Sequence, residues 1–193
     1  MRSYGRILRA PRMAHLLGAT LLARLPIGIN GLAIVLFVRA QTGSFAAAGA
    51  AAGALALGTG LGAPVGGRLV DRFGPWVLVV LGVVHAAGLG AHVALGLAGA
   101  PVAALVASSG LAGLAFPPTS SVQRTLYPRL LAGEPALIQG AFALDSVLTQ
   151  TLFVVGPLLT AAAVALIAPA AALALSAAAV LVGTVAFVAA MPP

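Results

Sequence analysis

Six long apolar runs divide the chain, and short stretches rich in polar residues, glycine or proline separate them. The runs cover residues of about 16–38, 45–66, 76–97, 102–121, 136–160 and 164–190. An α-helix needs about 20 apolar residues to cross the hydrocarbon core of a bilayer, whereas a barrel strand alternates apolar and polar residues over about ten positions. The runs are longer than barrel strands and continuous. They therefore predict an all-α, polytopic membrane protein with a bundle of six transmembrane helices.

Little of the chain lies outside the six runs. Residues 1–15 form a basic N-terminal segment, and residues 191–193 form the C-terminal end. A basic segment followed by an apolar run is also typical of a secretory signal. The first run is too long for a signal, contains Arg24 and precedes five similar runs. We therefore predict that it is a retained transmembrane helix.

The composition suits lipid as the surrounding solvent. Of the 193 residues, 61% are hydrophobic and 7% are charged, whereas a soluble domain carries about 25% charged residues. The chain has no cysteine, which excludes disulfides and thiolate metal sites, and we expect no metal and no cofactor. The net charge of +7 comes from arginines scattered between apolar runs. We therefore expect the lipid bilayer as a partner, and no nucleic acid.

The arginines also predict the orientation of the bundle. Eight precede the first run or lie between runs two and three or four and five, namely Arg2, Arg6, Arg9, Arg12, Arg68, Arg72, Arg124 and Arg129. Arg39 alone lies on the other side, and Arg24 lies inside the first run. Loops with excess arginine stay in the cytoplasm. We therefore expect a multi-pass protein of the cell (plasma) membrane with both termini in the cytoplasm.

The connection between the second and third runs carries a motif. It reads Gly67-Arg68-Leu69-Val70-Asp71-Arg72-Phe73-Gly74-Pro75-Trp76. This resembles the cytoplasmic signature Gly-x-Leu-x-Asp-Arg-x-Gly of the major facilitator superfamily, and the matching positions are Gly67, Leu69, Asp71, Arg72 and Gly74. Pro75 and Trp76 replace the basic pair that usually follows. The resemblance implies the N-terminal six-helix half of such a transporter, in which this loop acts as a conformational gate against the other half.

The residues of the motif also have plain structural interpretations. Glycines allow a tight turn between antiparallel helices. Asp71 lies close to the predicted start of the third helix, where the positive end of the helix dipole favours a carboxylate. Arg72 is expected to pair with Asp71 or with anionic lipid headgroups. A solvated turn with a helix cap therefore remains an alternative to the gate.

The fifth run carries a second, partial resemblance at Gly156-Pro157. Drug-exporting members of the superfamily have Gly-Pro followed by two glycines three residues later, and here Thr160 and Ala161 stand at those positions. The exporters also have an arginine in the fourth span where this chain has Val106. Proline inside a membrane helix frees a carbonyl and kinks the helix, so a purely structural kink is the alternative.

Arg24 and Asp145 are the only charges well inside the apolar runs. Each costs at least about 2.5 kcal/mol at the bilayer centre when it stands alone. Arg24 lies eight residues after Leu16 and Asp145 nine after Ala136, so both are about 12–14 Å from the cytoplasmic edge. We hypothesise that they pair or share one cavity. A structural ion pair, a solute or proton site, and no contact at all are the three alternatives.

Other small and polar residues suit helix packing or cavity lining. Gly58, Gly62 and Gly66 form one stripe that lets another helix approach closely, either in the bundle or at an interface between two transporter halves. His85 and His92 are seven residues apart on one face, and zinc would want three or four donors. The remaining candidates for cavity lining are Asn30, Thr149, Gln150 and Thr151.

The resemblance implies alternating-access transport of a small solute, with efflux as one direction, driven by protons or another ion gradient. The chain has no Gly-x-Ser-x-Gly elbow, no paired intramembrane aspartates and no phosphate-binding Gly-x-x-x-x-Gly-Lys loop, and we expect no enzymatic activity. Substrate sites in such folds lie between two halves, and this chain supplies one. It is therefore either a fragment, or a half that assembles with a missing C-terminal half or a second copy, or a membrane scaffold or regulatory subunit without transport.

Overall fold

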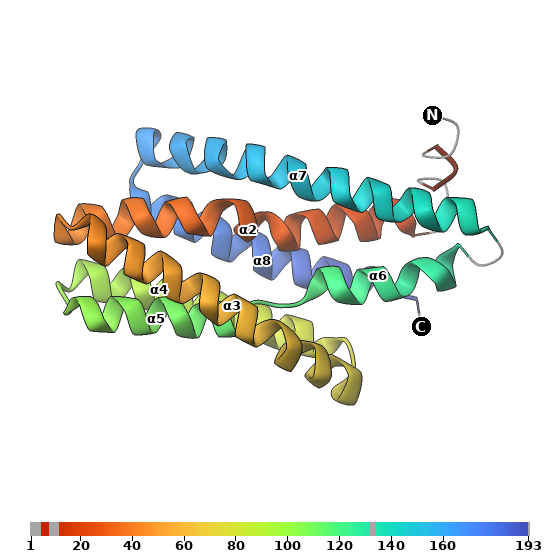
Figure 1. Cartoon of the computed structure of the whole chain (residues 1–193), viewed down its shortest axis with the longest axis horizontal. Coiled ribbons are helices and arrows are strands. Elements are labelled where there is room, and N and C mark those ends of the chain that lie inside the picture. Colours follow the sequence, from red (N-terminus) through yellow and green to blue (C-terminus); the bar gives the residue numbers. More distant parts are fainter. Residues whose placement is uncertain (1–4, 8–11, 132–133, 193) are drawn as a thin grey trace.

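The computed structural model describes residues 5–7, 12–131 and 134–192, and this part of the chain is helical with no strand. Helical residues 5–7 precede seven longer helices (Figure 1). These are α2 (Met13–Thr42), α3 (Phe45–Phe73), α4 (Trp76–Leu97), α5 (Val102–Leu114), α6 (Thr119–Leu130), α7 (Pro135–Leu166) and α8 (Pro169–Ala190). Six segments are long and apolar enough to cross a membrane, with α5 and α6 together forming the fourth. The predicted all-α bundle of six membrane helices is confirmed.

Several helices extend beyond the apolar runs that predicted them. The first run covered residues 16–38, whereas α2 has 30 residues, and α3 continues from the second run to Phe73. Thirty helical residues are about 45 Å long, which matches a bilayer including its headgroup regions. The polar residues at the ends of the runs therefore continue the helices instead of forming loops.

The fourth span differs from its prediction as one unbroken run over 102–121 followed by a polar loop. The helix stops at Leu114, residues 115–118 are not helical, and α6 then continues to Leu130. Pro117 and Pro118 cause the break, because proline lacks an N–H and disfavours a helical conformation in the residue before it. Non-helical backbone at membrane depth must be shielded from lipid, and both prolines are buried.

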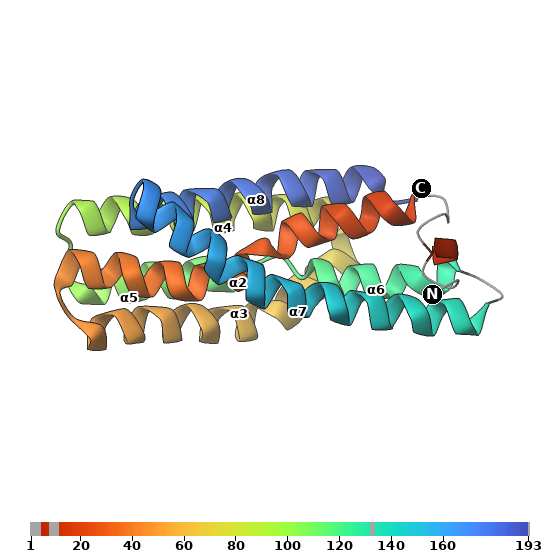
Figure 2. The ribbon, with the colours of Figure 1, turned by 90° about the horizontal axis from the view of Figure 1, so that it is seen from above.

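Helix α2 lies inside the bundle and packs against α8, α7 and α3 (Figures 1 and 2). Its first turn and the last turn of α8 lie at the same end, where Arg12 Nη1 donates to the carbonyl of Met191 at 3.1 Å. We call this end the basic end, because it carries Arg6, Arg12, Arg68, Arg72 and Arg129. Of the arginines that predicted the orientation, Arg2 and Arg9 lie outside the described residues.

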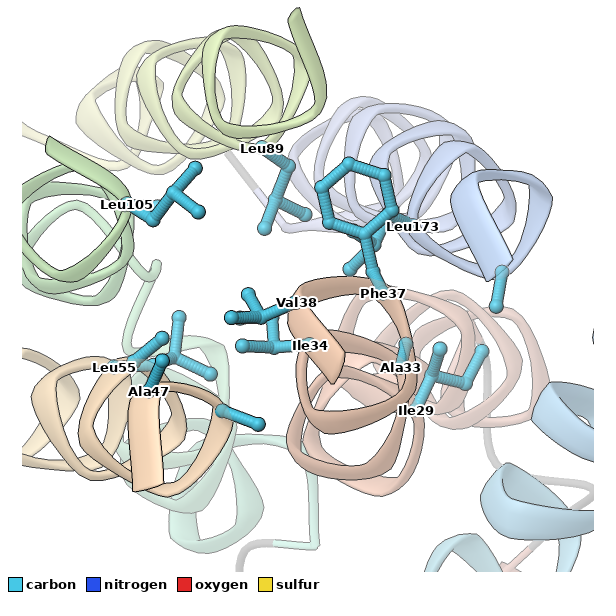
Figure 3. Close-up of a cluster of buried hydrophobic side chains, with 14 residues drawn as sticks. Ile29, Ala33, Ile34, Phe37, Val38, Ala47, Leu55, Leu89, Leu105 and Leu173 are labelled. Carbon is cyan, nitrogen blue, oxygen red and sulfur yellow. The ribbon is translucent and has the colours of Figure 1, made fainter. Parts of the chain in front are cut away.

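The largest apolar core lies in the half of the bundle away from the basic end. Figure 3 shows Ile34, Phe37 and Val38 of α2 pointing toward Leu89 of α4 and Leu105 of α5, all at most 1% exposed. Two smaller clusters occupy the basic half, where charged and polar side chains are also buried. The apolar core therefore fixes the distal half, whereas the buried charges of Arg24 and Asp145 lie in the basic half.

The glycine stripe of the second span packs inside the bundle. A methyl group on Gly58 would overlap the carbonyl of Gly110, and one on Gly62 would overlap the carbonyl of Leu114. Gly66 is less crowded, with a side-chain carbon of Pro118 as its nearest neighbour at 3.1 Å from the added methyl. The stripe is thus the contact between α3 and the fourth span, which is the packing alternative and not an interface with another half.

Candidate functional site

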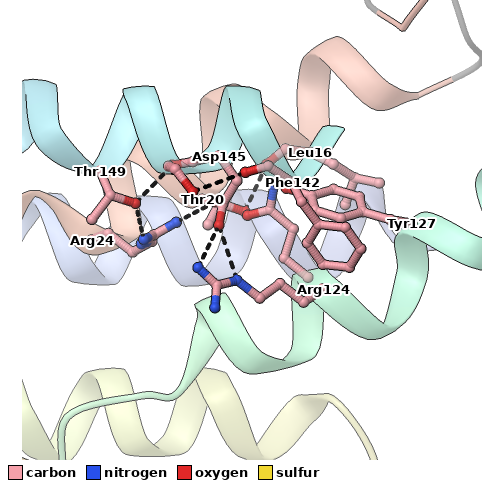
Figure 4. Close-up of polar contacts among 10 residues, drawn as sticks. Leu16, Thr20, Arg24, Arg124, Tyr127, Phe142, Asp145 and Thr149 are labelled. Carbon is pink, nitrogen blue, oxygen red and sulfur yellow. Dashed lines mark hydrogen bonds and ion pairs between the residues drawn. The ribbon is translucent and has the colours of Figure 1, made fainter. Parts of the chain in front are cut away.

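A buried ion pair joins α2 and α7. Arg24 Nη1 lies 2.6 Å from Asp145 Oδ1, and the two residues are 5% and 1% exposed. Arg24 also donates through Nη2 to the hydroxyl of Thr149, which in turn donates to the backbone carbonyl of Asp145 at 2.7 Å. The contact that we hypothesised from the sequence is therefore present (Figure 4). Its role in function stays a prediction.

Arg124 is the third member of this cluster, and the sequence analysis missed it. Its Nε and Nη2 both lie 3.0 Å from Asp145 Oδ2, and its side chain is 50% exposed. The sequence predicts Arg124 between the fourth and fifth spans, among the orienting charges, whereas it lies on α6 within the fourth span. Each carboxylate oxygen thus meets a different guanidinium, and the cluster carries a net charge of +1.

Uncharged polar groups of α2 and α6 surround the cluster. Gln123 Nε2 donates to the hydroxyl of Tyr127 at 2.6 Å, and Thr20 lines the same small space between Arg24 and Asp145. That space is too small for a water molecule. Within the described part of the chain, Arg24 Nε and Gln123 Oε1 are buried without a hydrogen-bond partner. Burying a polar atom without a hydrogen-bond partner costs free energy. A rearrangement that gives these two atoms a partner, or that lets water reach them, is therefore favoured by that cost.

The motif between the second and third spans lies mostly in a helix and not in a loop. Gly67, Leu69, Asp71 and Arg72 belong to α3, and only Gly74, with a φ of 94°, turns the chain toward α4. Asp71 therefore lies in the last turn of α3, where the dipole of that helix disfavours a carboxylate. The five matching residues occupy the end of a long helix because α3 continues past the apolar run.

The charged side chains of the motif stay at the surface. Asp71 and Arg72 are both exposed, and no ion pair joins them among the described residues. The guanidinium of Arg72 lies 5.2 Å from the centre of the Phe73 ring instead. The expected pairing with Asp71 is thus absent in this structure, while the gating role of the motif is not tested by it.

Gly156 and Pro157 lie where α7 crosses α2. A methyl group on Gly156 would overlap the backbone of Gly28, and one on Gly28 would overlap the carbonyl of Leu152. The Gly156 carbonyl accepts from the hydroxyl of Thr160 at 2.9 Å. Pro157 lies inside one continuous helix, so the predicted kink is not tested. Packing explains the glycine at position 156, because α2 and α7 touch here through their backbones.

A second buried polar network joins four helices away from the ion cluster. Asn30 Nδ2 lies 3.2 Å from His85 Nε2, and the side-chain oxygen Oδ1 of Asn30 accepts from the hydroxyl of Ser176. His85 Nδ1 lies 2.7 Å from the carbonyl of Ala112, which is consistent with a neutral imidazole that donates from Nδ1 and accepts at Nε2. Asn30, predicted as cavity lining, is instead one member of an interhelical hydrogen-bond network.

His92 lies in the same core without a metal-like environment. Its Nδ1 lies 2.9 Å from the hydroxyl of Ser108, and its ring lies beside Phe37. In the part of the chain that the structure describes, no group of three or more potential ligands could hold a metal ion. The two histidines therefore serve as helix contacts here.

No protein-family model, no curated protein and no solved structure matches this chain. Its function must therefore be argued from its own residues. The structure contributes six apolar helices, which indicate a multi-pass membrane protein in contact with the lipid bilayer. It also contributes an ion cluster beside a broken membrane span.

Proposed function

We propose that this chain is one half of a secondary transporter of the major facilitator kind, which moves a small solute by alternating access. The observation that carries the proposal is the juxtaposition of a broken fourth span with the ion cluster of the buried Arg24 and Asp145 and the half-exposed Arg124. Discontinuous membrane helices are typical of transporter binding sites. Ionisable groups inside a membrane are expensive, and they mark solute or ion pathways.

The proposed moving part is α6, the basic-end half of the fourth span. Tight glycine contacts hold α5 against α3, whereas α6 makes much smaller contacts with α2 and α7. The pairing of Arg124 with Asp145 ties α6 to α7. Breaking that pair would free the half-helix to move at the proline break, which would open the solute path at the basic end.

The proposed coupling ion is a proton on Asp145. The charged and titratable groups that face Asp145 are Arg24 from α2 and Arg124 and Tyr127 from α6 (Figure 4). A protonated carboxyl has no charge with which to hold two guanidiniums. The exposed Arg124 would then separate before the buried Arg24, because water can solvate it. Proton uptake would thus release α6.

The proposal requires a second half to complete the solute path. The exposed face of α7 carries Ser146, Gln150 and Thr151 in the middle of a membrane span. Polar side chains at this depth usually face protein or water and not lipid. We propose that a C-terminal half or a second copy covers this face. The basic end would lie on the cytoplasmic side of the cell membrane.

Solute distribution in cells tests the transport proposal. Cells that express the wild-type protein and cells that express Asp145→Asn, at equal membrane levels, are compared for small solutes inside and outside. We expect at least one solute to shift with the wild type alone, and a protonophore to abolish the shift. Arg129→Gln is the matched control, because it also removes a charge but Arg129 is exposed and lies outside the ion cluster. If no solute shifts, the chain is a membrane subunit without transport.

The mass of the native polypeptide tests the need for a second half. An antibody raised against residues 67–76 can detect it in membranes of the source cell, since part of this segment is exposed. A band near 18.8 kDa would support assembly with a second chain or copy. A band of about twice that mass would place both halves in one polypeptide, as in single-chain transporters with two repeats.

A further inference from the structure

A groove of about 500 Å³ lies between α2 and α8 at the basic end. The two helices touch closely at Gly183, where an added methyl group would overlap the backbone of Ala23. The groove begins on the terminal side of this contact. Its lining consists of Arg12, His15, Gly18, Ala19, Leu22, Ala186, Ala189 and Ala190. Most of the lining residues are exposed, so the groove opens to the outside of the bundle.

The lining separates charge from apolar surface along its length. Arg12 and His15 are three residues apart in the first turn of α2, which places them on one side of the helix. The rest of the lining is apolar and mostly glycine or alanine. These small side chains leave room for an extended apolar group to lie against the two helices. The lining contains no acidic residue, and the carboxylate of Glu134 is already paired with Arg6.

Arg12 is held in a specific position at the mouth of the groove. Its backbone has a φ of 64°, a left-handed conformation that is uncommon for residues other than glycine. One guanidinium nitrogen donates to the Met191 carbonyl at the end of α8. A guanidinium carries five N–H groups, and among the described residues the Met191 carbonyl is the hydrogen-bond partner of this one, so further donors can meet an anion.

We propose that this groove binds an anionic phospholipid, with its phosphate on Arg12 and His15 and one acyl chain along the glycine and alanine surface. From Arg12 to Leu22 the groove extends about 15 Å along α2, which equals about half of the hydrocarbon thickness and so the depth of one leaflet. Basic pockets between membrane helices are known to hold anionic headgroups. The proposal does not depend on transport, because it uses neither the ion cluster nor a second half.

Lipid retention tests the proposal directly. The full chain is reconstituted in a bilayer of equal parts phosphatidylglycerol and phosphatidylcholine, extracted in mild detergent and examined by native mass spectrometry. We expect the wild-type protein to retain phosphatidylglycerol about fivefold over phosphatidylcholine, as one cationic contact implies. Equal retention of the two lipids would overturn the proposal. An excess of inorganic phosphate should leave the retained lipid in place, and its displacement by phosphate alone would show a headgroup site without a seated chain.

Two kinds of variant separate the headgroup contact from the acyl contact. Arg12→Gln should remove the preference for phosphatidylglycerol and His15→Gln should weaken it, whereas Ala189→Leu should reduce retention of both lipids by filling the groove. Arg68→Gln is the matched control, since Arg68 is exposed at the same end but lies on α3 outside the groove. His15 has no hydrogen bond to another described residue, so His15→Gln remains a fair test if Arg12→Gln unfolds.

Any loss of the preference in Arg68→Gln would mean that general surface charge, and not the groove, selects the lipid. A dimer or a foreign protein segment in the groove would also contradict the proposal. Native masses would show it as a second protein chain in place of lipid. Only preferential lipid retention that depends on Arg12 or His15, and that Ala189→Leu removes, supports the inference.

Discussion

Arg124 Nε and Nη2 lie 3.0 Å from Asp145 Oδ2, although 21 residues of sequence and the connection between α6 and α7 separate the two residues. This contact joins α6, which has few other neighbours, to α7. Arg24 occupies the other oxygen of the same carboxylate from the opposite side. Asp145 of α7 therefore joins three helices of the basic half, because it pairs with α2 through Arg24 and with α6 through Arg124.

Removing Arg124 should loosen α6 without unfolding the bundle. Because its side chain is half exposed, we expect Arg124→Gln to cost only about 1 kcal/mol or less. The chain has no cysteine, so a single Leu126→Cys, at a position 5% exposed, can report opening by its rate of maleimide labelling. Labelling should be several-fold faster with Arg124→Gln. Arg129→Gln should leave it unchanged, and equal rates in both would show that the pair does not hold α6.

Arg24 and Asp145 should show strong energetic coupling. Truncating one partner of a buried pair costs up to about 3–5 kcal/mol, and the remaining contact of Asp145 with Arg124 lowers that cost for Arg24→Ala. We therefore expect Arg24→Ala to lower the melting temperature in detergent, and the double variant with Asp145→Asn to be milder than the sum of the singles. Strict additivity would contradict coupling. Ser146→Ala, next in sequence but exposed, should melt like the wild type.

The crossing of α2 and α7 should not tolerate a methyl group. Gly28→Ala and Gly156→Ala each force two backbones apart, and overpacking of this kind costs about 1–3 kcal/mol. Gly31→Ala is the matched control on the same helix, because an added methyl there meets nothing within 4 Å. It should be neutral or stabilise by up to about 1 kcal/mol through helix propensity. Thermal melting of the three variants distinguishes these outcomes.

The two outer glycines of the 67–74 motif should respond differently to alanine. Gly74 has a φ of 94°, so Gly74→Ala strains the turn and should cost about 1 kcal/mol or more. Gly67 is helical with open space around it, so Gly67→Ala should not destabilise the folded protein. If transport is nevertheless lost in Gly67→Ala while melting is unchanged, the position has a gating role that the isolated half does not display.

The network around Asn30 should contribute modestly to stability. Asn30→Ala leaves His85 Nε2 and the hydroxyl of Ser176 without their shared partner, and interhelical hydrogen bonds in membranes average about 0.6 kcal/mol with a maximum near 1.7. We expect a loss of about 1–2 kcal/mol in thermal melting. Thr151→Ala, whose hydroxyl bonds its own helix at Val147, should change nothing measurable.

The bundle and the Arg24–Asp145 contact could be predicted because they depend on strong local signals. Apolar runs of helical length indicate membrane spans, and a charge inside such a run needs a partner at a similar depth. With Arg24 and Asp145 as the only charges inside the predicted spans, each was the natural partner of the other. The first and last residues of the helices were harder to predict, because helices such as α3 continue past the apolar run into polar sequence.

Arg124 was missed because α6 is a polar helix that resembles a loop in composition. Its signal was periodicity and not hydropathy: Val122, Leu126 and Leu130 recur every four residues, and all three belong to or pack against one buried cluster. The contacts of Asn30 with His85 and Ser176 had no such signal. Helices that are far apart in the sequence can pair in many registers, and the packing of the whole core decides between them.

The broken fourth span also constrains how the chain enters the membrane during synthesis. Arg124 leaves the ribosome 21 residues before Asp145, and a lone arginine inside a nascent span is penalised at the translocon, by up to about 2.5–3.5 kcal/mol at the centre of the span. We therefore expect α6 to wait at the membrane surface until α7 emerges. The fourth and fifth spans would then insert together as a helical hairpin, so biogenesis of this protein depends on a charge pair that hydropathy alone does not reveal.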